Sequence, residues 1–209
     1  MHIDDARADG GEAGADAALL ITPYYNKPTQ EGLYRHYKAI AEAVDLPLVL
    51  YNIPGRTGVN MFPATIARLA VIETIVGVKE GSGVIQQASD IVQTCGDRLA
   101  VLAGDDAMTL PMMAVGGKGV ITVTANIAPT EMANMVKAFA AGNIEEARRI
   151  HFQLSPLFAA LFYETNPIPV KEALGMMGKI APELRLPLCS MGKENRDKLM
   201  QVMKEGRFI

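Results

Sequence analysis

The sequence predicts an α/β protein in which a parallel sheet is covered by helices. Short apolar runs recur at intervals of roughly 20 to 30 residues, about the length of one strand-plus-helix unit. The segments between them have apolar residues at helical spacing, and the strand pattern stops after Ala128. Such tandem units favour parallel strands. The five runs are Ala18–Thr22, Leu48–Ile53, Ile75–Val78, Leu99–Ala103 and Gly119–Val123.

The helices between these strands are predicted from apolar stripes and from end signals. Thr29 is the expected N-cap of a helix whose stripe runs from Leu33 to Val44. Pro63 suits the first turn of the next helix, because the N–H that proline lacks has no helical partner there. Gly96 is expected to end a third helix that begins near Ile85. A shorter helix is expected over Met108–Val115.

The last third of the chain is predicted to be helical. Asn143, with Glu146 three residues later, is a capping-box-like start for a helix that we expect to continue to about Tyr163. Three other helices are expected over Pro129–Ala141, Val170–Met177 and Lys193–Lys204. The predicted organisation is therefore an atypical segment at residues 1–17, a sheet region at 18–127 and a helical region at 128–209.

Composition excludes several classes of function. The 209 residues carry a net charge of −3 without a basic run, which argues against nucleic acid as a partner. No apolar run approaches membrane-spanning length, and Met1–Ala17 lacks the apolar core of a signal peptide. We therefore expect a cytoplasmic protein. Cys95 and Cys189 are expected to be reduced core thiols, and the three histidines follow no metal-binding spacing, so no metal site is expected.

Lys79 is the most informative single residue. It follows the apolar run Ile75–Val78 and precedes a glycine-rich turn. An ammonium is costly to bury, so Lys79 either emerges into solvent at the end of the strand or lines a cavity. In a cavity, desolvation would lower its pKa and free the amine to attack a carbonyl carbon.

Residues near the ends of the other strands favour the interpretation that Lys79 lines a cavity. Tyr24 and Tyr25 follow the first predicted strand. Tyr51 lies near the end of the second predicted strand, and Arg56 follows that strand. Side chains at the carboxyl ends of parallel strands share one rim. A phenol beside an amine suits proton transfer, and a guanidinium suits a carboxylate, so the set predicts Schiff-base chemistry on a keto acid. The tyrosines could also be packing residues, and Arg56 an ordinary surface arginine.

Two further motifs have simpler interpretations. Asp105 and Asp106 could form a metal pair, but adjacent carboxylates at a loop–helix junction more often cap the helix. The glycine-rich segment 116–119 precedes a strand, whereas a phosphate-binding loop precedes a helix.

Five segments together carry a family resemblance. The chain resembles the dihydrodipicolinate synthase branch of the N-acetylneuraminate lyase family of pyruvate-dependent class I aldolases, from about Gly11 onward. Arg56 in its Arg-Thr-Gly context favours the synthase branch. The segments are Pro23–Asn26, Tyr51–Gly58, Val76–Glu80, Gly104–Asp106 and Asn166–Lys171.

The resemblance implies a fold and an activity. The fold would be a (β/α)8 TIM-type barrel that lacks its first three βα units and carries a C-terminal helical extension. The activity would be condensation of pyruvate with L-aspartate 4-semialdehyde in lysine (diaminopimelate) biosynthesis, by a lyase that acts as a homo-oligomer, a dimer or tetramer. No cofactor is implied beyond the covalent Schiff base of pyruvate on Lys79.

The resemblance also implies residue roles. Lys79 would form the Schiff base, Tyr51 would relay protons, and Tyr25 would reach into the site of a neighbouring subunit. Arg56 would bind the carboxylate of the semialdehyde. Gly104 and the Ile121 backbone would line the pyruvate pocket.

The resemblance leaves part of the family pattern unmatched. The family has a Gly-Thr-Thr-Gly-Glu turn that links the tyrosines of its proton relay, and this sequence contains none. A barrel without three strands would expose two sheet edges and one side of its core, which predicts low stability or self-association.

Alternatives therefore remain. The chain could be a sibling aldolase that uses another aldehyde, or a truncated, inactive remnant or partner subunit. A doubly wound nucleotide-binding domain would fit five strands, but the turn from Pro23 to Pro28 has no glycines to hold a phosphate.

Overall fold

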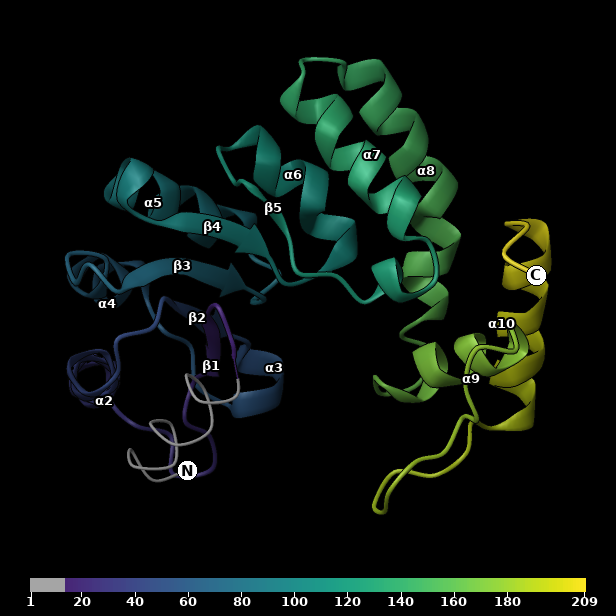
Figure 1. The fold of residues 1–209 in the computed structure, drawn as a ribbon, viewed down its shortest axis with the longest axis horizontal. Helices are drawn as coiled ribbons and strands as arrows, with labels where there is room; N and C mark the ends of the chain where they lie inside the picture. The colour runs from purple at the N-terminus through teal and green to yellow at the C-terminus, as the bar shows by residue number, and fades with distance from the viewer. Residues whose placement is uncertain (1–13) are drawn as a thin grey trace. The chain divides into compact units, whose positions relative to one another are not determined.

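The computed structural model describes residues 14–209, and they divide into two compact units. The first unit ends at Ile121 and the second runs from Thr122 to Ile209. The first contains the sheet and the second is helical (Figure 1). The expected segment at residues 1–17 lies, up to residue 13, outside the described residues.

A five-stranded parallel sheet forms the first unit, as predicted. The strands pair in the order in which they occur along the chain, β1-β2-β3-β4-β5. A doubly wound sheet would instead reverse its strand order at a switch point, where a nucleotide binds. The sequential order overturns the nucleotide-binding alternative. The strands are β1 (Ala18–Ile21), β2 (Leu48–Asn52), β3 (Ile75–Glu80), β4 (Ala100–Ala103) and β5 (Gly119–Val120).

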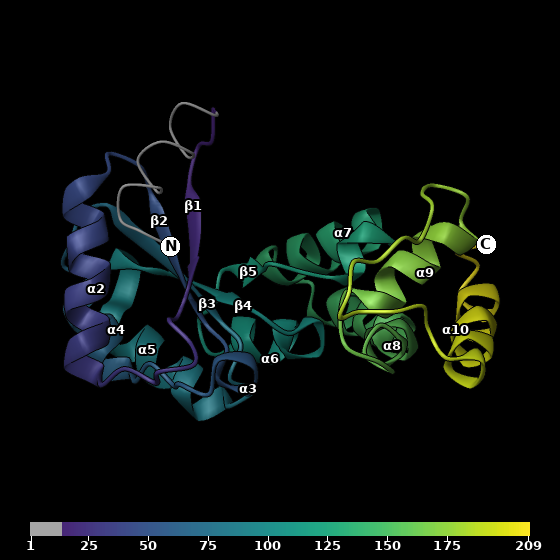
Figure 2. The same cartoon turned by 90° about the horizontal axis from the view of Figure 1, so that it is seen from below.

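The connecting helices α2, α4 and α5 lie along one face of this sheet (Figures 1 and 2). Helix α4 packs between α2 and α5. Two short helices, α3 and α6, follow β2 and β4. The bounds of the five helices are Gln30–Ala43 for α2, Pro54–Thr57 for α3, Pro63–Leu69 for α4, Ile85–Cys95 for α5 and Thr109–Ala114 for α6.

The strand register separates two faces. Leu20, Leu50, Val78 and Val101 occupy one row across β1 to β4, and all four are buried in the hydrophobic core. Successive residues of a strand point to opposite faces. The neighbouring row of Ile21, Tyr51, Lys79 and Leu102 therefore lies on the face opposite the core. Ile21 is 43% exposed there.

The predicted helix ends are confirmed. The Thr29 hydroxyl accepts a hydrogen bond from the Gly32 N–H at 3.2 Å, which satisfies one of the first free donors of α2. Pro63 occupies the first turn of α4. Gly96 follows the last residue of α5 with φ +57°, a conformation that favours glycine.

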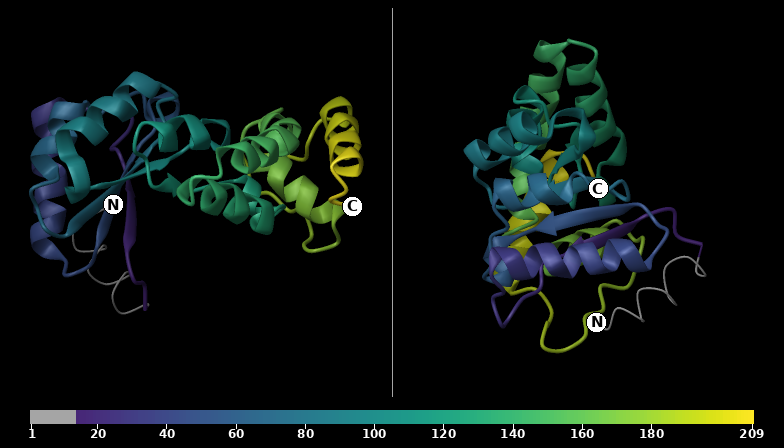
Figure 3. Two further views of the ribbon diagram at one scale, coloured as in Figure 1. Left: turned by 90° about the horizontal axis from the view of Figure 1, so that it is seen from above. Right: turned by 90° about the vertical axis from the view of Figure 1, so that its left-hand side faces the viewer.

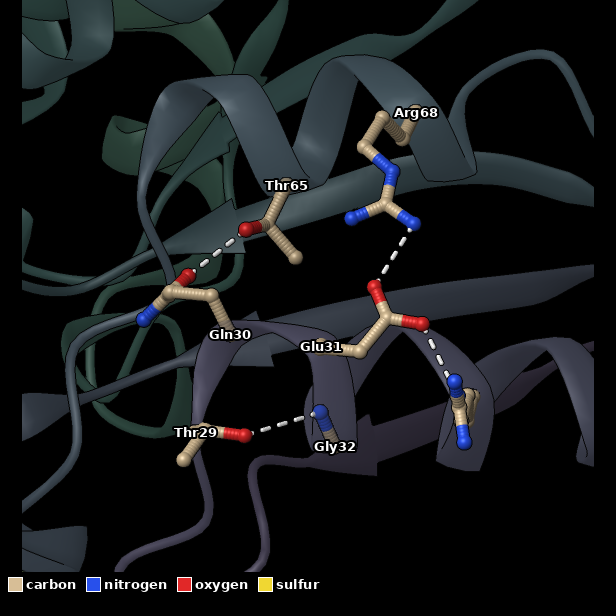
Figure 4. A network of polar contacts seen from close by, with 7 residues as sticks. Thr29, Gln30, Glu31, Gly32, Thr65 and Arg68 are labelled. Carbon is tan, nitrogen blue, oxygen red and sulfur yellow. Dashed lines mark hydrogen bonds and ion pairs between the residues drawn. The ribbon is translucent and has the colours of Figure 1, made fainter.

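Polar contacts join α2 to α4 (Figure 4). The Gln30 side-chain oxygen accepts from the Thr65 hydroxyl at 2.7 Å and from the Phe62 N–H at 3.0 Å. The Glu31 carboxylate pairs with Arg68 at 2.9 Å, and with Arg35 one turn along α2. Gln30 thereby fixes the chain segment that leads into α4.

The second unit is built of helices and begins at Thr122, whereas the sequence predicted a helical region from residue 128. Helices α7 and α8 lie side by side (Figures 1 and 3). Asn143 caps α8 by accepting from the Glu146 N–H at 3.2 Å, while the Glu146 carboxylate pairs with Arg149 and does not complete a capping box. The helices are α7 (Pro129–Ala140), α8 (Ile144–Ala160), α9 (Ile168–Met176) and α10 (Lys193–Glu205).

Several sequence-based details are wrong. Cys189 is exposed, although Cys95 is a buried thiol as expected. Strand β5 ends at Val120, before the predicted Val123, because the chain turns there into a 3-10 helix (η3) at Thr124–Asn126. Helix α8 ends at Ala160, before Tyr163.

Within residues 14–209, no helix is long and apolar enough to cross a membrane. The same residues contain no cluster of three or more His, Cys, Asp or Glu side chains that could hold a metal ion.

Candidate active site

Lys79 and Tyr51 lie side by side at the carboxyl ends of β3 and β2. They are register partners, so their Cα atoms are neighbours across the two strands. The Lys79 Nζ lies 4.3 Å from the centroid of the Tyr51 ring. The structure therefore brings together the amine and the phenol predicted from the sequence.

Lys79 is only partly exposed at this position. Burial lowers the pKa of its ammonium, because desolvation disfavours the charged form, while the nearby negative charge of Asp106 acts in the opposite direction. A lowered pKa increases the neutral fraction of the amine near pH 7. The neutral amine is the form that attacks a carbonyl carbon.

The backbone of Tyr51 is also held by Thr22, the residue that directly follows β1. Its carbonyl oxygen accepts from the Thr22 N–H at 3.0 Å and from the Thr22 hydroxyl at 3.1 Å. Thr22 is fully buried. Burial raises the pKa of the Tyr51 phenol, and the positive charge of Arg56 opposes that rise. The phenol thus keeps its proton near neutral pH and can donate it.

Arg56 is placed by the short helix α3, which follows β2 directly. Pro54 occupies the first turn of this helix, and Gly58 ends it in the left-handed conformation with φ +71°. The Arg56 side chain is exposed, yet its charge acts on Tyr51. Arg56 therefore brings a positive charge close enough to act on the Tyr51 phenol.

Gly104 and Ile121 extend the same rim. The Gly104 N–H donates to the Glu80 carbonyl at 2.7 Å, and the Ile121 N–H donates to the Ala103 carbonyl at 3.0 Å. These bonds continue the sheet pairing one step beyond β4 and β5. Both residues thus lie at the end of the sheet where Lys79 projects.

Tyr25 is not brought to this group. It lies in the loop after β1 with φ +65° and is 92% exposed. Among residues 14–209, no hydrogen bond or ring contact joins its phenol to Lys79 or Tyr51.

Comparison with known proteins gives the family. The sequence profile of the dihydrodipicolinate synthetase family matches residues 5–206. The chain belongs to this family. A relative from Geobacter sp. (strain M21), called 4-hydroxy-tetrahydrodipicolinate synthase, is 59% identical over 198 residues, which are 95% of this chain and 68% of the relative.

Solved structures of the dihydrodipicolinate synthetase family have the same fold. One dihydrodipicolinate synthase superposes with a TM-score of 0.95 at 50% identity, covering 99% of this chain and 71% of its own. The chloride-inhibited enzyme from Acinetobacter baumannii, solved with pyruvate, gives a TM-score of 0.93 at 47% identity, with 95% of this chain and 68% of that chain covered.

The sequence interpretation missed three contributors to the site. Thr22 holds Tyr51, Asp106 acts on Lys79, and Gly81 allows the close approach of β2, since a Cβ at Gly81 would lie 3.1 Å from the Asn52 carbonyl oxygen. Thr22 and Gly81 directly follow β1 and β3, and Asp106 lies three residues after β4, so the sequence placed all three near strand ends. The interpretation of Asp105 as a cap is confirmed, because its carboxylate accepts from the Ala107 N–H at 2.9 Å.

Asp106→Asn is expected to shift the pH dependence of imine formation to lower pH. The Asp106 carboxylate stabilises the Lys79 ammonium and so raises its pKa. Without that charge the pKa of Lys79 falls further, and the neutral amine is present from a lower pH upward. The rate of pyruvate trapping at pH 7 should therefore rise. Measuring trapping rates from pH 5 to 10 tests this result.

The neighbouring variant Asp105→Asn is the matched control. Asp105 is exposed and caps the turn at Ala107. Its replacement should leave the pH profile of Lys79 in place. Identical profiles for Asp106→Asn and the unmodified protein would contradict the assigned electrostatics.

Gly104→Ala is expected to destabilise the fold by about 1–3 kcal/mol, the usual cost of overpacking. A Cβ there would lie 2.9 Å from the Gly81 Cα and 3.0 Å from the Glu80 carbonyl oxygen. Both are backbone atoms, so β3 and β4 would have to separate. Urea unfolding measures the effect. Gly55→Ala is the control, since nothing lies within 4 Å of its Cβ, and equal stability of the two variants would contradict the prediction.

Proposed function

We propose that this protein is a Schiff-base lyase that condenses pyruvate with L-aspartate 4-semialdehyde, the 4-hydroxy-tetrahydrodipicolinate synthase reaction of lysine (diaminopimelate) biosynthesis. The observation that carries the proposal is the half-buried Lys79 amine 4.3 Å from the ring centroid of Tyr51. The high identity to relatives called 4-hydroxy-tetrahydrodipicolinate synthase supports the choice of reaction.

In the proposed mechanism, the neutral Lys79 amine adds to the keto carbon of pyruvate. The carbinolamine then loses water to give the imine, and Tyr51 supplies and removes the protons of these steps. Loss of a proton from the pyruvate methyl group gives an enamine. The enamine carbon bonds to the aldehyde carbon of the semialdehyde. The amino group of the semialdehyde part then adds to the imine carbon, which closes the ring, and the bond from that carbon to the Lys79 nitrogen breaks, which frees the amine. Pyruvate is the only substrate that bonds directly to Lys79.

The remaining site residues would bind the substrates. Arg56 would pair with the carboxylate of the semialdehyde, because a guanidinium matches two carboxylate oxygens. Gly104 and the backbone of Ile121 would line the pyruvate pocket. Tyr25 would enter the site of a neighbouring subunit in a dimer or tetramer. The 92% exposure of Tyr25 supports a role outside its own unit.

The five strands would be the last five of an eight-stranded barrel, and the three preceding βα units would be absent from this chain. The sequential strand order supports a barrel, as does the exposure of Ile21 on the face opposite the core. The sheet region 18–127 would then be the barrel part and residues 128–209 the C-terminal helical extension.

Borohydride trapping tests the function. The protein is incubated with pyruvate, reduced and digested, and mass spectrometry locates the adduct. An adduct on Lys79, followed by turnover with aspartate semialdehyde, is the expected result. An adduct without that turnover would favour a sibling aldolase. A folded sample without an adduct would overturn the enzymatic assignment and leave an inactive remnant or partner subunit.

A further inference from the structure

A buried polar cluster lies directly behind the Lys79–Tyr51 pair. Asn52 and Glu80 follow Tyr51 and Lys79 in sequence and are themselves register partners. Adjacent residues of a strand point to opposite faces, so these two side chains point to the helix-covered face. Asn52 is fully buried, and Glu80 is only 3% exposed.

The Glu80 carboxylate is surrounded by N–H donors. Its Oε1 accepts from the Ser82 N–H at 2.7 Å. Its Oε2 accepts from the Asn52 Nδ2 at 3.0 Å and from the Gln87 Nε2 at 3.1 Å. All three donors are amide nitrogens, which can donate a hydrogen bond but cannot accept one. The environment therefore suits a carboxylate that only accepts.

Asn60 closes the cluster from the loop before α4. Its Oδ1 accepts from the Asn52 Nδ2 at 2.8 Å and from the Gln87 Nε2 at 3.1 Å, and its Nδ2 donates to the Gln87 Oε1 at 2.8 Å. The Gln30 Nε2 donates to the Asn60 carbonyl at 2.7 Å. The cluster thus ties the ends of β2 and β3 to α5 and, through Gln30, to α2.

Such a cluster is a costly way to fill a core. A buried carboxylate lowers stability unless its partners replace the lost water, and apolar side chains of similar volume often pack at least as well. What the polar groups add is direction, because each hydrogen bond fixes the orientation of the groups that it joins. The two strand residues so fixed are the immediate neighbours of the reacting pair.

We propose that Glu80, with Asn52, Asn60 and Gln87, is a positioning group that sets the approach of the Lys79 amine to the Tyr51 phenol. The inference rests on the proposed function for its effect on catalysis. Its geometric part concerns the placement of Lys79 and can be tested without pyruvate.

Glu80→Gln is the decisive variant because it keeps the size of the side chain and changes one oxygen to an NH2 group. In either orientation the new NH2 faces an N–H donor, at Ser82 or at Asn52 and Gln87. The strand ends must then shift. We expect pyruvate trapping on Lys79 to slow by about 10- to 100-fold in folded protein, since a displacement of about 1 Å can cost that much.

Ile75→Ala is the matched control for stability. Ile75 begins the same strand, is buried, and takes no part in the cluster. It should lower the melting temperature and leave the trapping rate of the folded protein unchanged. Equal slowing in Glu80→Gln and Ile75→Ala would reduce Glu80 to an ordinary stabilising residue and overturn the proposal.

Competitive labelling of lysine amines gives a readout that does not need pyruvate. The pH dependence of labelling at Lys79 reports its pKa, which depends on its burial and on the facing charge of Asp106. In Glu80→Gln we expect water to enter around Lys79, so that the pH dependence of its labelling becomes more like that of an exposed lysine. An unchanged labelling profile would overturn the positioning role. Failure of the unmodified protein to trap pyruvate would instead overturn the proposed function, and labelling would still decide the role of Glu80.

Discussion

Lys79→Met is expected to abolish the borohydride-trapped pyruvate adduct and to lower turnover by about 10⁴-fold or more, the scale of loss when a covalent nucleophile is removed. Methionine has a similar length and no amine, so it cannot form an imine. The variant should fold, because burial already disfavours the charge that it removes. Intact and peptide mass spectrometry after reduction measure the adduct.

Lys118→Met is the matched control for this loss. Lys118 lies next to β5 in the same unit, and its side chain is exposed, with a weak ion pair to Asp97 at 3.6 Å. Its replacement should leave both trapping and turnover unchanged. An adduct that persists in Lys79→Met would move the Schiff base to another lysine and contradict the site.

Arg56→Met is expected to separate the two half-reactions. Trapping of pyruvate on Lys79 should persist, because the imine forms from pyruvate and the amine alone. The value of kcat/KM for aspartate semialdehyde should fall by about 10²- to 10³-fold, in keeping with the loss of one partner of a desolvated charge pair. Steady-state kinetics beside borohydride trapping measure both quantities in one preparation.

Arg35→Met provides the comparison, since Arg35 is an exposed arginine on α2 whose ion pair with Glu31 lies on the helix surface. In Arg35→Met we expect little change in pyruvate trapping or in kcat/KM for the semialdehyde. If Arg56→Met turns over the semialdehyde as fast as the unmodified protein, Arg56 does not bind this substrate. The sibling-aldolase alternative would then gain support.

The sequence alone determined the class of the fold and much of the rim. Apolar runs and helix caps such as Thr29 and Asn143 are local features, set by burial and by the free backbone groups at helix ends. Lys79, Tyr51 and Arg56 could likewise be assigned to strand ends from their positions beside apolar runs, although the sequence did not give the distances between them. Strand ends were less certain, and β5 proved shorter than its apolar run.

The tertiary structure decided what depends on register and on contacts between distant segments. Only the pairing of β2 with β3 places Tyr51 beside Lys79 and Asn52 beside Glu80. The buried cluster joins residues that are distant in sequence, such as Asn52 and Glu80, 28 positions apart, which carry no common local pattern. The exposure of Cys189 likewise depends on packing around it. Hydrophobic periodicity reports which face of an element is buried, whereas register and long-range packing decide which side chains meet.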